Sequence, residues 1–544
     1  MLKETASISS IKYLIKIISE AELNYNTMLF PFFLFLFLGV YLLLRTPRMR
    51  RNWILVGNLV FYAWSGPACL LIVLVSGLIA YLAARGIEKI YSAFDGTGLS
   101  GRESRRAFAA YEKRARRWVA LALILILGVW IAVKAGRLAG LETVTSFAEL
   151  FSGGGILVPL GISYYTLSIT AYILDVYWQK TAAEHNFIKL FTAITYFPAI
   201  VQGPFCRYQK IMEQMDHLPG ADYQRVTRGL QLMTWGYIKK LVIADRIALF
   251  TGTIMADVSM YAGMEIVLAV ILGAVELYAD FSGCMDIVLG ISSAAGIELP
   301  ANFRQPFFSS SAPEFWRRWH ITLGEWTKEY IYLPIAMNSR FLKTGRKVKK
   351  RFGLIAGKAF SAIPPLLAVW LFTGLWHGTG WDYVCWGMYW AVLLILSQVT
   401  DEFWPKACEK LHIDTSRTYH RVWRMVRTFL LFCIGRMWTV TGETNGFFKL
   451  WTAILCESRF SSLTDGTLLG LGLDGWDFIV IVLGIAVMLA VDIAHEKGVG
   501  IRDAIAAQPL VLRWAVYYAA IFTVILLGIY GPGFDAASFV YGNF

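Results

Sequence analysis

The stretch LLAVWLFTGLWHGTGWDYVCWGMYW, residues 366–390, is an apolar run with a histidine near its middle. Eleven residues without a charge precede His377, and the run is long enough for a helix that crosses a bilayer. Ionisable residues at membrane depth are costly and usually face a cavity or a partner. The stretch therefore predicts a helical membrane protein in which His377 lies at an internal site.

The composition of the whole chain supports this interpretation. Of its 544 residues, 57% are hydrophobic and 16% are charged, and the mean hydropathy is +0.53. A soluble domain carries about 25% charged residues. Backbone groups in lipid must bond within their own segment, so we expect an all-α polytopic protein with about ten to twelve crossings. The candidate spans are 29–44, 53–65, 67–84, 118–133, 156–177, 187–203, 228–249, 264–280, 283–297, 361–376, 381–399, 424–440, 475–494 and 511–530.

The net charge of +13 is concentrated in three basic clusters, at residues 45–51, 102–117 and 340–351. Lys and Arg are enriched in loops that stay in the cytoplasm, so we expect these loops, 338–352 among them, on the cytoplasmic side. Binding of anionic lipid or nucleic acid by the clusters is the alternative. We expect membrane lipids, and no nucleic acid, among the partners.

The sequence divides into three parts by composition. Residues 1–27 have isoleucines at helical spacing with lysines between them, which predicts an amphipathic helix on the membrane or an extension without a specific role. Residues 28–400 form the expected membrane core, which starts with a retained anchor at 29–44. Residues 401–544 add further transmembrane helices of the same membrane domain.

The seven cysteines are scattered without metal-ligand spacing, which argues against a metal site or a disulfide framework. Cys284 and Cys385 lie in apolar stretches and are expected to be inert core residues. Motifs for nucleotide binding and a GxSxG nucleophile are absent from the sequence. We therefore expect no metal and no tightly bound cofactor.

A second unusual stretch is NFRQPFFSSSAPEFWRRWHITLGEWTKEYIYLP, residues 302–334. The serines at 309–311 followed by Pro313 are typical of a helix start. The helix that follows is too charged to cross lipid and suits the membrane interface or a polar cavity. His320 follows Trp316 by four positions and therefore shares a face with apolar residues.

A lone histidine in an apolar segment is more often a hydrogen-bonded core residue than a catalyst. Two histidines in one chain, both among tryptophans and glycines, favour a functional site. His320 and His377 are therefore the candidate site residues.

The two histidine stretches, EFWRRWHITLGEWTKEYIYLPI (314–335) and GLWHGTGWDYVCWG (374–387), resemble the paired histidine motifs of the membrane-bound O-acyltransferase family. The resemblance runs from about residue 28 to about residue 400. Within the family, these stretches resemble the bacterial branch that acylates extracellular polymers. That branch includes the alginate O-acetylation membrane protein and the D-alanine transfer protein of teichoic acids. The supporting stretches are NLVFYAWSGP (58–67), VPLGISYYTLSITAYILDVY (158–177), YFPAIVQGPFCRY (196–208), KKLVIADRIA (239–248) and YADFSGCMDIVLGISSAAGIELPANFRQPF (278–307).

The resemblance implies a ring of tilted transmembrane helices, with short interfacial or re-entrant helices, around a central tunnel. It implies that His377 is the catalytic histidine and that His320 fills the second active-site position. It further implies an O-acetyltransferase of the bacterial cytoplasmic membrane that takes an acyl group from a cytoplasmic thioester, acetyl-CoA or an acyl carrier protein. The implied acceptor is an extracellular polysaccharide such as alginate, or a secreted acyltransferase partner. D-alanyl transfer to teichoic acid from a carrier protein is the alternative.

The chemistry agrees with these residue types. Acyl transfer to a hydroxyl needs a base near the hydroxyl and a donor near the developing oxyanion. A neutral imidazole can take the hydroxyl proton near pH 7. We therefore assign His377 as general base, and His320 to polarising the carbonyl or orienting the substrate.

Further polar and aromatic residues are candidates for the tunnel lining or for structural support. Glu276 and Asp280 lie four apart, so they share one helical face. A pairing with arginine that locks the central helices is favoured over direct catalysis. The candidate arginines are Arg304, Arg317 and Arg318. Asn302 either fixes the turn before the interfacial helix or serves only as a cap of that helix. The tryptophans in this set are Trp316 and Trp376.

Two other function classes stay open at this point. The chain could be a transporter in which the histidines relay protons, or a scaffold that recruits a secreted transferase. Acyl transfer by purified protein separates the enzyme from both, and a scaffold should tolerate replacement of both histidines.

Overall fold

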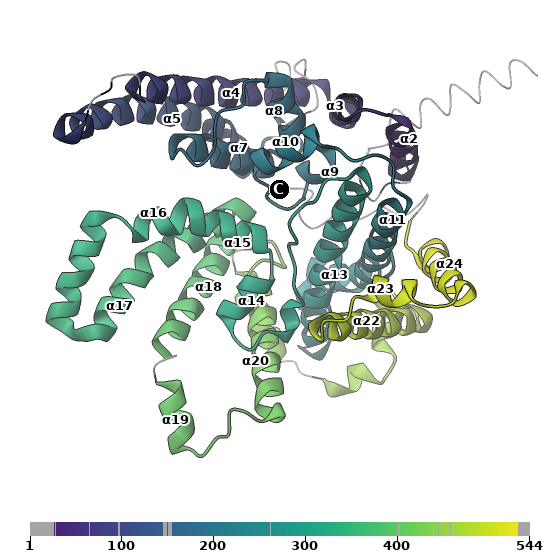
Figure 1. The fold of residues 1–544 in the computed structure, drawn as a ribbon. Coiled ribbons are helices and arrows are strands. Elements are labelled where there is room, and N and C mark those ends of the chain that lie inside the picture. The colour runs from purple at the N-terminus through teal and green to yellow at the C-terminus, as the bar shows by residue number, and fades with distance from the viewer. Residues whose placement is uncertain are drawn as a thin grey trace, which may run out of the picture. The chain divides into compact units, whose positions relative to one another are not determined.

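The computed structural model describes residues 25, 27, 29–64, 66–95, 98, 100–144, 149–150, 155–261, 263–400, 403–443, 445–456 and 459–530. Nearly all regular structure in these ranges is helical (Figure 1). The chain forms two compact units. The first consists of the described residues up to Leu230 together with Val288–Leu299, Ile529 and Tyr530; the second consists of the described residues in Gln231–Ile287 and Pro300–Gly528.

The first unit is built from helices and one short parallel strand pair. Its core is aromatic where α2 and α3 meet α9, and Asn58 ties α3 to α8 by donating to the Thr192 carbonyl at 3.0 Å. The helices are α2 (Leu29–Leu43), α3 (Pro47–Trp64), α4 (Pro67–Asp95), α5 (Gly101–Leu138), α7 (Ile162–Tyr177), α8 (Phe187–Ile194), α9 (Phe197–Ile200), α10 (Tyr208–Asp216) and α11 (Tyr223–Tyr237), and the strands are β1 (Thr143–Val144) and β2 (Ile156–Leu157). Of these, α11 continues beyond Leu230 into the second unit.

The proposed N-terminal extension, 1–27, lies outside the described residues apart from Tyr25 and Thr27. Tyr25 is fully buried, and its hydroxyl donates to the Phe197 carbonyl at 2.6 Å. Its ring stacks on Phe61 with centroids 5.8 Å apart. Tyr25 is therefore part of the packed first unit, while the amphipathic helix and the boundaries at 27 and 400 stay predictions.

The second unit contains both candidate histidines and the chain from Pro300 to Gly528, and its helix α13 continues beyond Ile287 into the first unit. Its helix α17 bends back on itself at Gly353, whose φ of 90° and ψ of 177° are not helical (Figure 1). The elements are η1 (Ile238–Ala244), α12 (Asp245–Ala256), η2 (Val258–Met260), α13 (Gly263–Ala295), η3 (Pro306–Phe308), α14 (Ala312–Arg318), α15 (Ile321–Thr327), η4 (Lys328–Tyr332), α16 (Leu333–Ala336), α17 (Ser339–His377), α18 (Trp381–Thr400), α19 (Trp404–Lys410), α20 (Thr418–Arg436), α21 (Gly446–Cys456), η5 (Phe460–Leu463), η6 (Thr467–Gly470), α22 (Gly475–Glu496), α23 (Ile501–Ala506) and α24 (Leu510–Leu527).

Seven helices in the described part of the chain are long and apolar enough to cross a membrane. The expected all-α polytopic fold is therefore confirmed. The seven are Ala68–Asp95, Gly101–Leu138, Gly263–Ala295, Ala356–His377, Trp381–Thr400, Gly475–Glu496 and Leu510–Leu527, and two shorter apolar helices are Leu29–Leu43 and Gly446–Cys456. The arrangement of the spans around a tunnel stays a prediction.

Several expected spans differ from the helices found. Segments 264–280 and 283–297 were expected separately, but a single helix, α13, runs through Gly283. A Cβ on Gly283 would lie 2.8 Å from the Gly236 carbonyl oxygen, so this glycine permits close helix packing instead of breaking the helix. Segment 187–203 contains only the short helices α8 and α9.

The basic segment 338–352 was expected to be a loop, but residues 339–352 form the first arm of α17. We still expect it on the cytoplasmic side, because its cations resist translocation. Cysteine introduced at Lys347, labelled with a membrane-impermeant reagent in intact and in permeabilised cells, tests this. Labelling should require permeabilisation, and strong labelling of intact cells would contradict the topology.

Candidate active site

His320 lies at a sharp turn between α14 and α15 in the second unit. Its backbone is left-handed, with a φ of 48°, which costs about 1–3 kcal/mol for a residue other than glycine. Two backbone hydrogen bonds hold this turn against the preceding segment. Ile321 donates to the Asn302 carbonyl at 3.0 Å, and Arg304 donates to the Arg318 carbonyl at 2.9 Å. These two backbone hydrogen bonds therefore hold His320 in its strained backbone conformation.

The side chain of Asn302 sets the orientation of the His320 ring. Its oxygen accepts hydrogen bonds from the Thr322 backbone N–H at 3.0 Å and from the Thr322 hydroxyl at 2.9 Å. The amide nitrogen then faces Nδ1 of His320 at 3.1 Å, closer than the amide oxygen at 3.3 Å. Because the amide nitrogen can only donate, Nδ1 accepts and the proton of the neutral ring belongs on Nε2. This arrangement makes Nε2–H a hydrogen-bond donor.

Burial keeps the His320 ring in its neutral form. The residue is 3% exposed, and its ring meets Phe281 edge to face with centroids 4.8 Å apart. Removal from water disfavours the charged imidazolium, so burial holds the pKa of His320 far below the ordinary histidine value. At physiological pH the ring is therefore available as a neutral donor.

His377 is the last residue of α17, and its ring lies next to that of His320. The two ring centroids are 6.3 Å apart, and both residues are buried. The His377 ring is flanked by Trp376, at a centroid distance of 4.7 Å, and by Trp386 at 5.1 Å. The structure thus brings the two sequence-predicted histidines into one apolar site.

The sequence reasoning missed two tryptophans of α18 that connect this site to Trp316. Trp386 contacts both the His377 ring and Trp316, the latter with centroids 6.0 Å apart. Trp390 lies one turn further on, 5.0 Å from Trp316. Their spacing of four residues on an apolar helix was the available signal that they share a face.

The glycines around His377 serve helix packing. A Cβ on Gly374 would lie 2.5 Å from the Tyr383 carbonyl oxygen, and one on Gly378 would lie 2.0 Å from the Tyr383 ring. These glycines bring α18 against the end of α17. The His377 ring itself is flanked by Trp376 and Trp386.

Glu276 and Asp280 have structural partners, as favoured, but the partners are not the expected arginines. Asp280 lies 2.6 Å from Nζ of Lys240, and Glu276 accepts a hydrogen bond from the Thr251 hydroxyl at 2.6 Å. Arg436 approaches Glu276 at 4.0 Å. The error arose because these partners come from elements distant in sequence.

The two arginines beside His320 differ in their surroundings. Arg318 pairs with Glu314 at 2.9 Å and with Glu496 at 2.7 Å, which joins α14 to α22. These carboxylates raise the pKa of Arg318 above its ordinary value. Arg317 is exposed. Arg318 therefore links α14, the helix that precedes His320, to α22.

Cys284 is buried and Cys385 is partly buried, and base-assisted direct transfer needs no cysteine nucleophile. We expect Cys284→Ser and Cys385→Ser to retain most of their transfer activity, measured at matched protein levels. An acyl group trapped on either cysteine, detected by mass spectrometry of the intact protein, would contradict direct transfer.

Within the described ranges, no cluster of three or more His, Cys, Asp or Glu side chains could hold a metal ion.

Comparison with known proteins connects this site to a family. Residues 178–349 match the model of the MBOAT, membrane-bound O-acyltransferase, family. The probable alginate O-acetylase of Pseudomonas aeruginosa is 30% identical over 420 residues, which cover 76% of this chain and 71% of the relative. The chain belongs to the membrane-bound O-acyltransferase family. It is a multi-pass membrane acyltransferase, as expected from the paired histidine stretches.

Two further relatives show the range of proteins to which this membrane-bound O-acyltransferase is similar. The peptidoglycan O-acetyltransferase of Helicobacter pylori is 27% identical, covering 70% of this chain and 71% of the relative. The teichoic acid D-alanyltransferase of Lacticaseibacillus rhamnosus is 26% identical, covering 48% and 65%. The region matched by the family model contains Asn302 and His320 and ends before His377. The roles of the individual site residues stay predictions.

Proposed function

We propose that the protein is an O-acetyltransferase of the bacterial cytoplasmic membrane that moves an acetyl group from a cytoplasmic thioester donor toward hydroxyls outside the cell. The acceptor is an extracellular polysaccharide such as alginate, or a secreted acyltransferase that completes the transfer to the polymer. The similarity to O-acetylases extends over 76% and 70% of the chain, whereas the similarity to the D-alanyltransferase covers only 48%. This difference supports acetyl transfer over D-alanyl transfer.

The observation that carries this proposal is the pair of buried histidine rings, 6.3 Å apart, of which one has its tautomer set by Asn302. His377 takes the proton from the acceptor hydroxyl, and the hydroxyl oxygen attacks the thioester carbonyl carbon. The Nε2–H of His320 donates a hydrogen bond to the oxyanion that forms. When the carbon–sulfur bond breaks, His377 returns its proton to the departing thiolate.

The apolar surroundings support both roles. Tryptophans and Phe281 exclude water from the two rings, which strengthens a hydrogen bond to a developing oxyanion and limits hydrolysis of the thioester. The neutral state of the His320 ring matches a hydrogen-bond donor, and the tryptophans around the His377 ring match a base that is shielded from water. The mechanism needs no tightly bound cofactor, and the thioester is a co-substrate.

The experiment is transfer of radiolabelled acetyl by the purified full chain in lipid nanodiscs. Acetyl-CoA and an acetylated carrier protein are compared as donors, and a polysaccharide or its secreted transferase is the acceptor. The proposal predicts label in the acceptor only when donor and enzyme are both present. Label from a D-alanyl carrier protein but not from either acetyl donor would overturn it in favour of D-alanylation.

A further inference from the structure

The helices α4 and α5 extend beyond the apolar part of their spans as a packed arm. The α4–α5 arm consists of residues 85–95 of α4 and residues 101–117 of α5, and the two helices lie side by side along it (Figure 1). Aromatic rings fill the space between them. The ring centroid of Phe108 lies 6.1 Å from that of Tyr91 and 5.3 Å from that of Phe94. The arm therefore has a small aromatic core of its own.

The base of the arm is attached to the end of α7 within the first unit. The Tyr91 hydroxyl donates to the Tyr177 carbonyl at 3.1 Å, and the Tyr177 hydroxyl donates to the Glu112 carboxylate at 3.1 Å. Glu112 also pairs with Arg116 at 3.0 Å. These contacts come from both helices of the arm, so they hold it in one orientation on α7.

The outer side of α5 in this arm carries a row of exposed cations. This cationic row consists of Arg102, Arg106, Lys113 and Arg117, all of which are exposed. At 3.6 residues per turn the four positions point within about 60° of one another, and the row is about 22 Å long. The carboxylates of the same stretch, at positions 103 and 112, lie beside the row by this spacing and not within it. A row of this length is suited to an extended anionic surface.

A membrane surface reaches only the lower end of this row. The apolar part of α5 begins at Trp118, and the helix runs through this point without a non-helical residue. Arg102 therefore lies about 24 Å further along the axis, and still about 18 Å above the hydrocarbon core if the helix tilts by about 40°. Headgroups account for about 5–8 Å of that height, and physiological salt screens charges beyond about 8 Å. The outer end of the row thus faces water, and its partner is soluble.

We propose that the cationic row of the α4–α5 arm docks the acidic face of a soluble carrier protein that delivers the acyl group as a thioester. This proposal rests on the acetyl transfer proposed above. The basic run 102–117 is expected in the cytoplasm, where the thioester donor is located. A row of about 22 Å is complementary in charge and length to an acidic protein helix of about 15 residues. A small donor such as acetyl-CoA does not require a row of this length.

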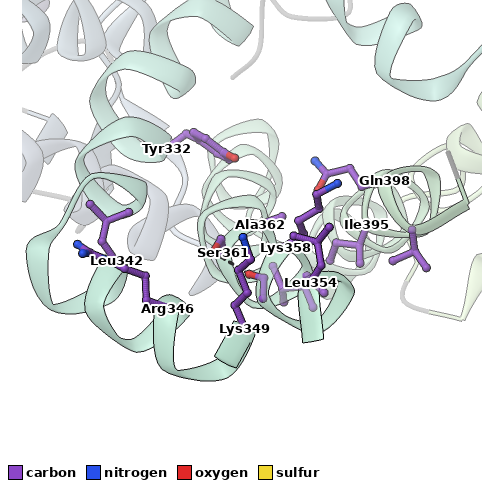
Figure 2. Close-up of a pocket in the computed structure, with 15 residues that line it drawn as sticks. Tyr332, Leu342, Arg346, Lys349, Leu354, Lys358, Ser361, Ala362, Ile395 and Gln398 are labelled. Atoms are coloured by element: carbon purple, nitrogen blue, oxygen red, sulfur yellow. Dashed lines mark hydrogen bonds between the residues drawn. The ribbon is translucent and has the colours of Figure 1, made fainter. Parts of the chain in front are cut away.

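The first arm of α17 offers a matched set of cations for a control. Figure 2 shows Arg346 and Lys349 of this arm among the residues that line a pocket between the two arms of α17. Arg340, Lys347 and Lys350 do not line this pocket, and they are exposed like the cationic row. Changing these three residues alters the net charge of the protein as much as changing three residues of the row.

The test measures binding of an acetylated, acidic bacterial acyl carrier protein to the full chain in phosphatidylcholine nanodiscs, with no turnover required. The row variant combines Arg102→Glu, Arg106→Glu and Lys113→Glu. The matched variant combines Arg340→Glu, Lys347→Glu and Lys350→Glu. A third variant, with Arg102→Lys, Arg106→Lys and Lys113→Arg, keeps the charge of the row and controls for folding together with the Tm.

We expect the row variant to bind the carrier protein on the order of 10- to 100-fold more weakly, with the matched and charge-preserving variants close to wild type. Binding by wild type should weaken as salt is raised. Unchanged binding by the row variant, or equal losses in the row and matched variants, would overturn the docking surface. Carrier binding by a wild type that transfers acetyl from neither donor would instead contradict the proposed function and leave the docking surface standing.

A second measurement separates the carrier protein from an anionic membrane as the partner of the row. A fluorophore is attached to Ala109→Cys, an exposed position between the cations, in a chain whose exposed Cys456 is replaced by serine. In nanodiscs that contain phosphatidylglycerol and a headgroup quencher, we expect little quenching until the outer end of the arm is brought to the membrane. Strong quenching in the wild-type background, lost in the row variant, would show that the row lies on the lipid and would overturn the proposal.

Discussion

Replacing His377 by glutamine is expected to lower acyl transfer by about 10²–10⁴-fold, the usual contribution of a positioned general base. Glutamine keeps a polar side chain of similar length but cannot take a proton near neutral pH. The measurement is transfer of radiolabelled acetyl by purified variant and wild type at matched, monodisperse protein levels. Alanine is a poorer choice, because the ring is packed between Trp376 and Trp386 and its removal also leaves a cavity.

The chain offers a matched control for this experiment. His420 is another buried histidine of the second unit, at the start of α20. The charged residue that interacts with it electrostatically is Asp414. His420→Gln should leave the transfer rate close to wild type even if it lowers stability slightly. Near-normal transfer by His377→Gln, or an equal loss in both variants, would assign His377 a structural role.

The second large effect is expected on stability. Lys240 is buried between two carboxylates, with Nζ 2.6 Å from Asp280 and 2.8 Å from Asp245. Lys240→Met leaves both carboxylates buried without their cation, which typically costs about 3–5 kcal/mol of unfolding free energy. Burial already raises the pKa of Asp245 to about 7, so this carboxyl is the one expected to take up a proton. The measurement is the Tm and the monodisperse yield of the purified protein.

Two comparisons make the Lys240 result specific. Lys347→Met removes an exposed cation and should leave the Tm unchanged. Adding Asp280→Asn to Lys240→Met removes one of the two orphaned charges and should recover part of the loss. A Tm for Lys240→Met equal to that of Lys347→Met would mean that the buried triad contributes nothing to folding.

Local patterns in the sequence predicted the features that depend on neighbouring residues. His320 and His377 stood out because few histidines occur in such apolar, Trp-rich runs. Asn302 was expected to act at the turn before α14, but its side chain contacts His320 and Thr322 at the turn that follows this helix. The long spans followed from hydropathy alone. These features need only the composition of one segment.

Features that depend on long-range pairing were missed or assigned wrongly. Asp280 pairs with Lys240, which lies 40 residues away and on another element. Many cations in a basic chain could fill that role, and spacing cannot choose among them. The bend of α17 at Gly353 was also missed, because a glycine in a basic run is equally compatible with a loop.

The account depends on His320 and His377 having different roles, and one set of variants tests this directly. Asparagine at position 320 can still donate a hydrogen bond to a carbonyl, whereas alanine cannot, and neither can act as a base. We predict that His320→Asn transfers acetyl faster than His320→Ala, and that both exceed His377→Gln, in the radiolabelled transfer assay at matched protein levels. A His320→Asn variant as inactive as His377→Gln would show that His320 exchanges protons, and would contradict the proposed division between donor and base.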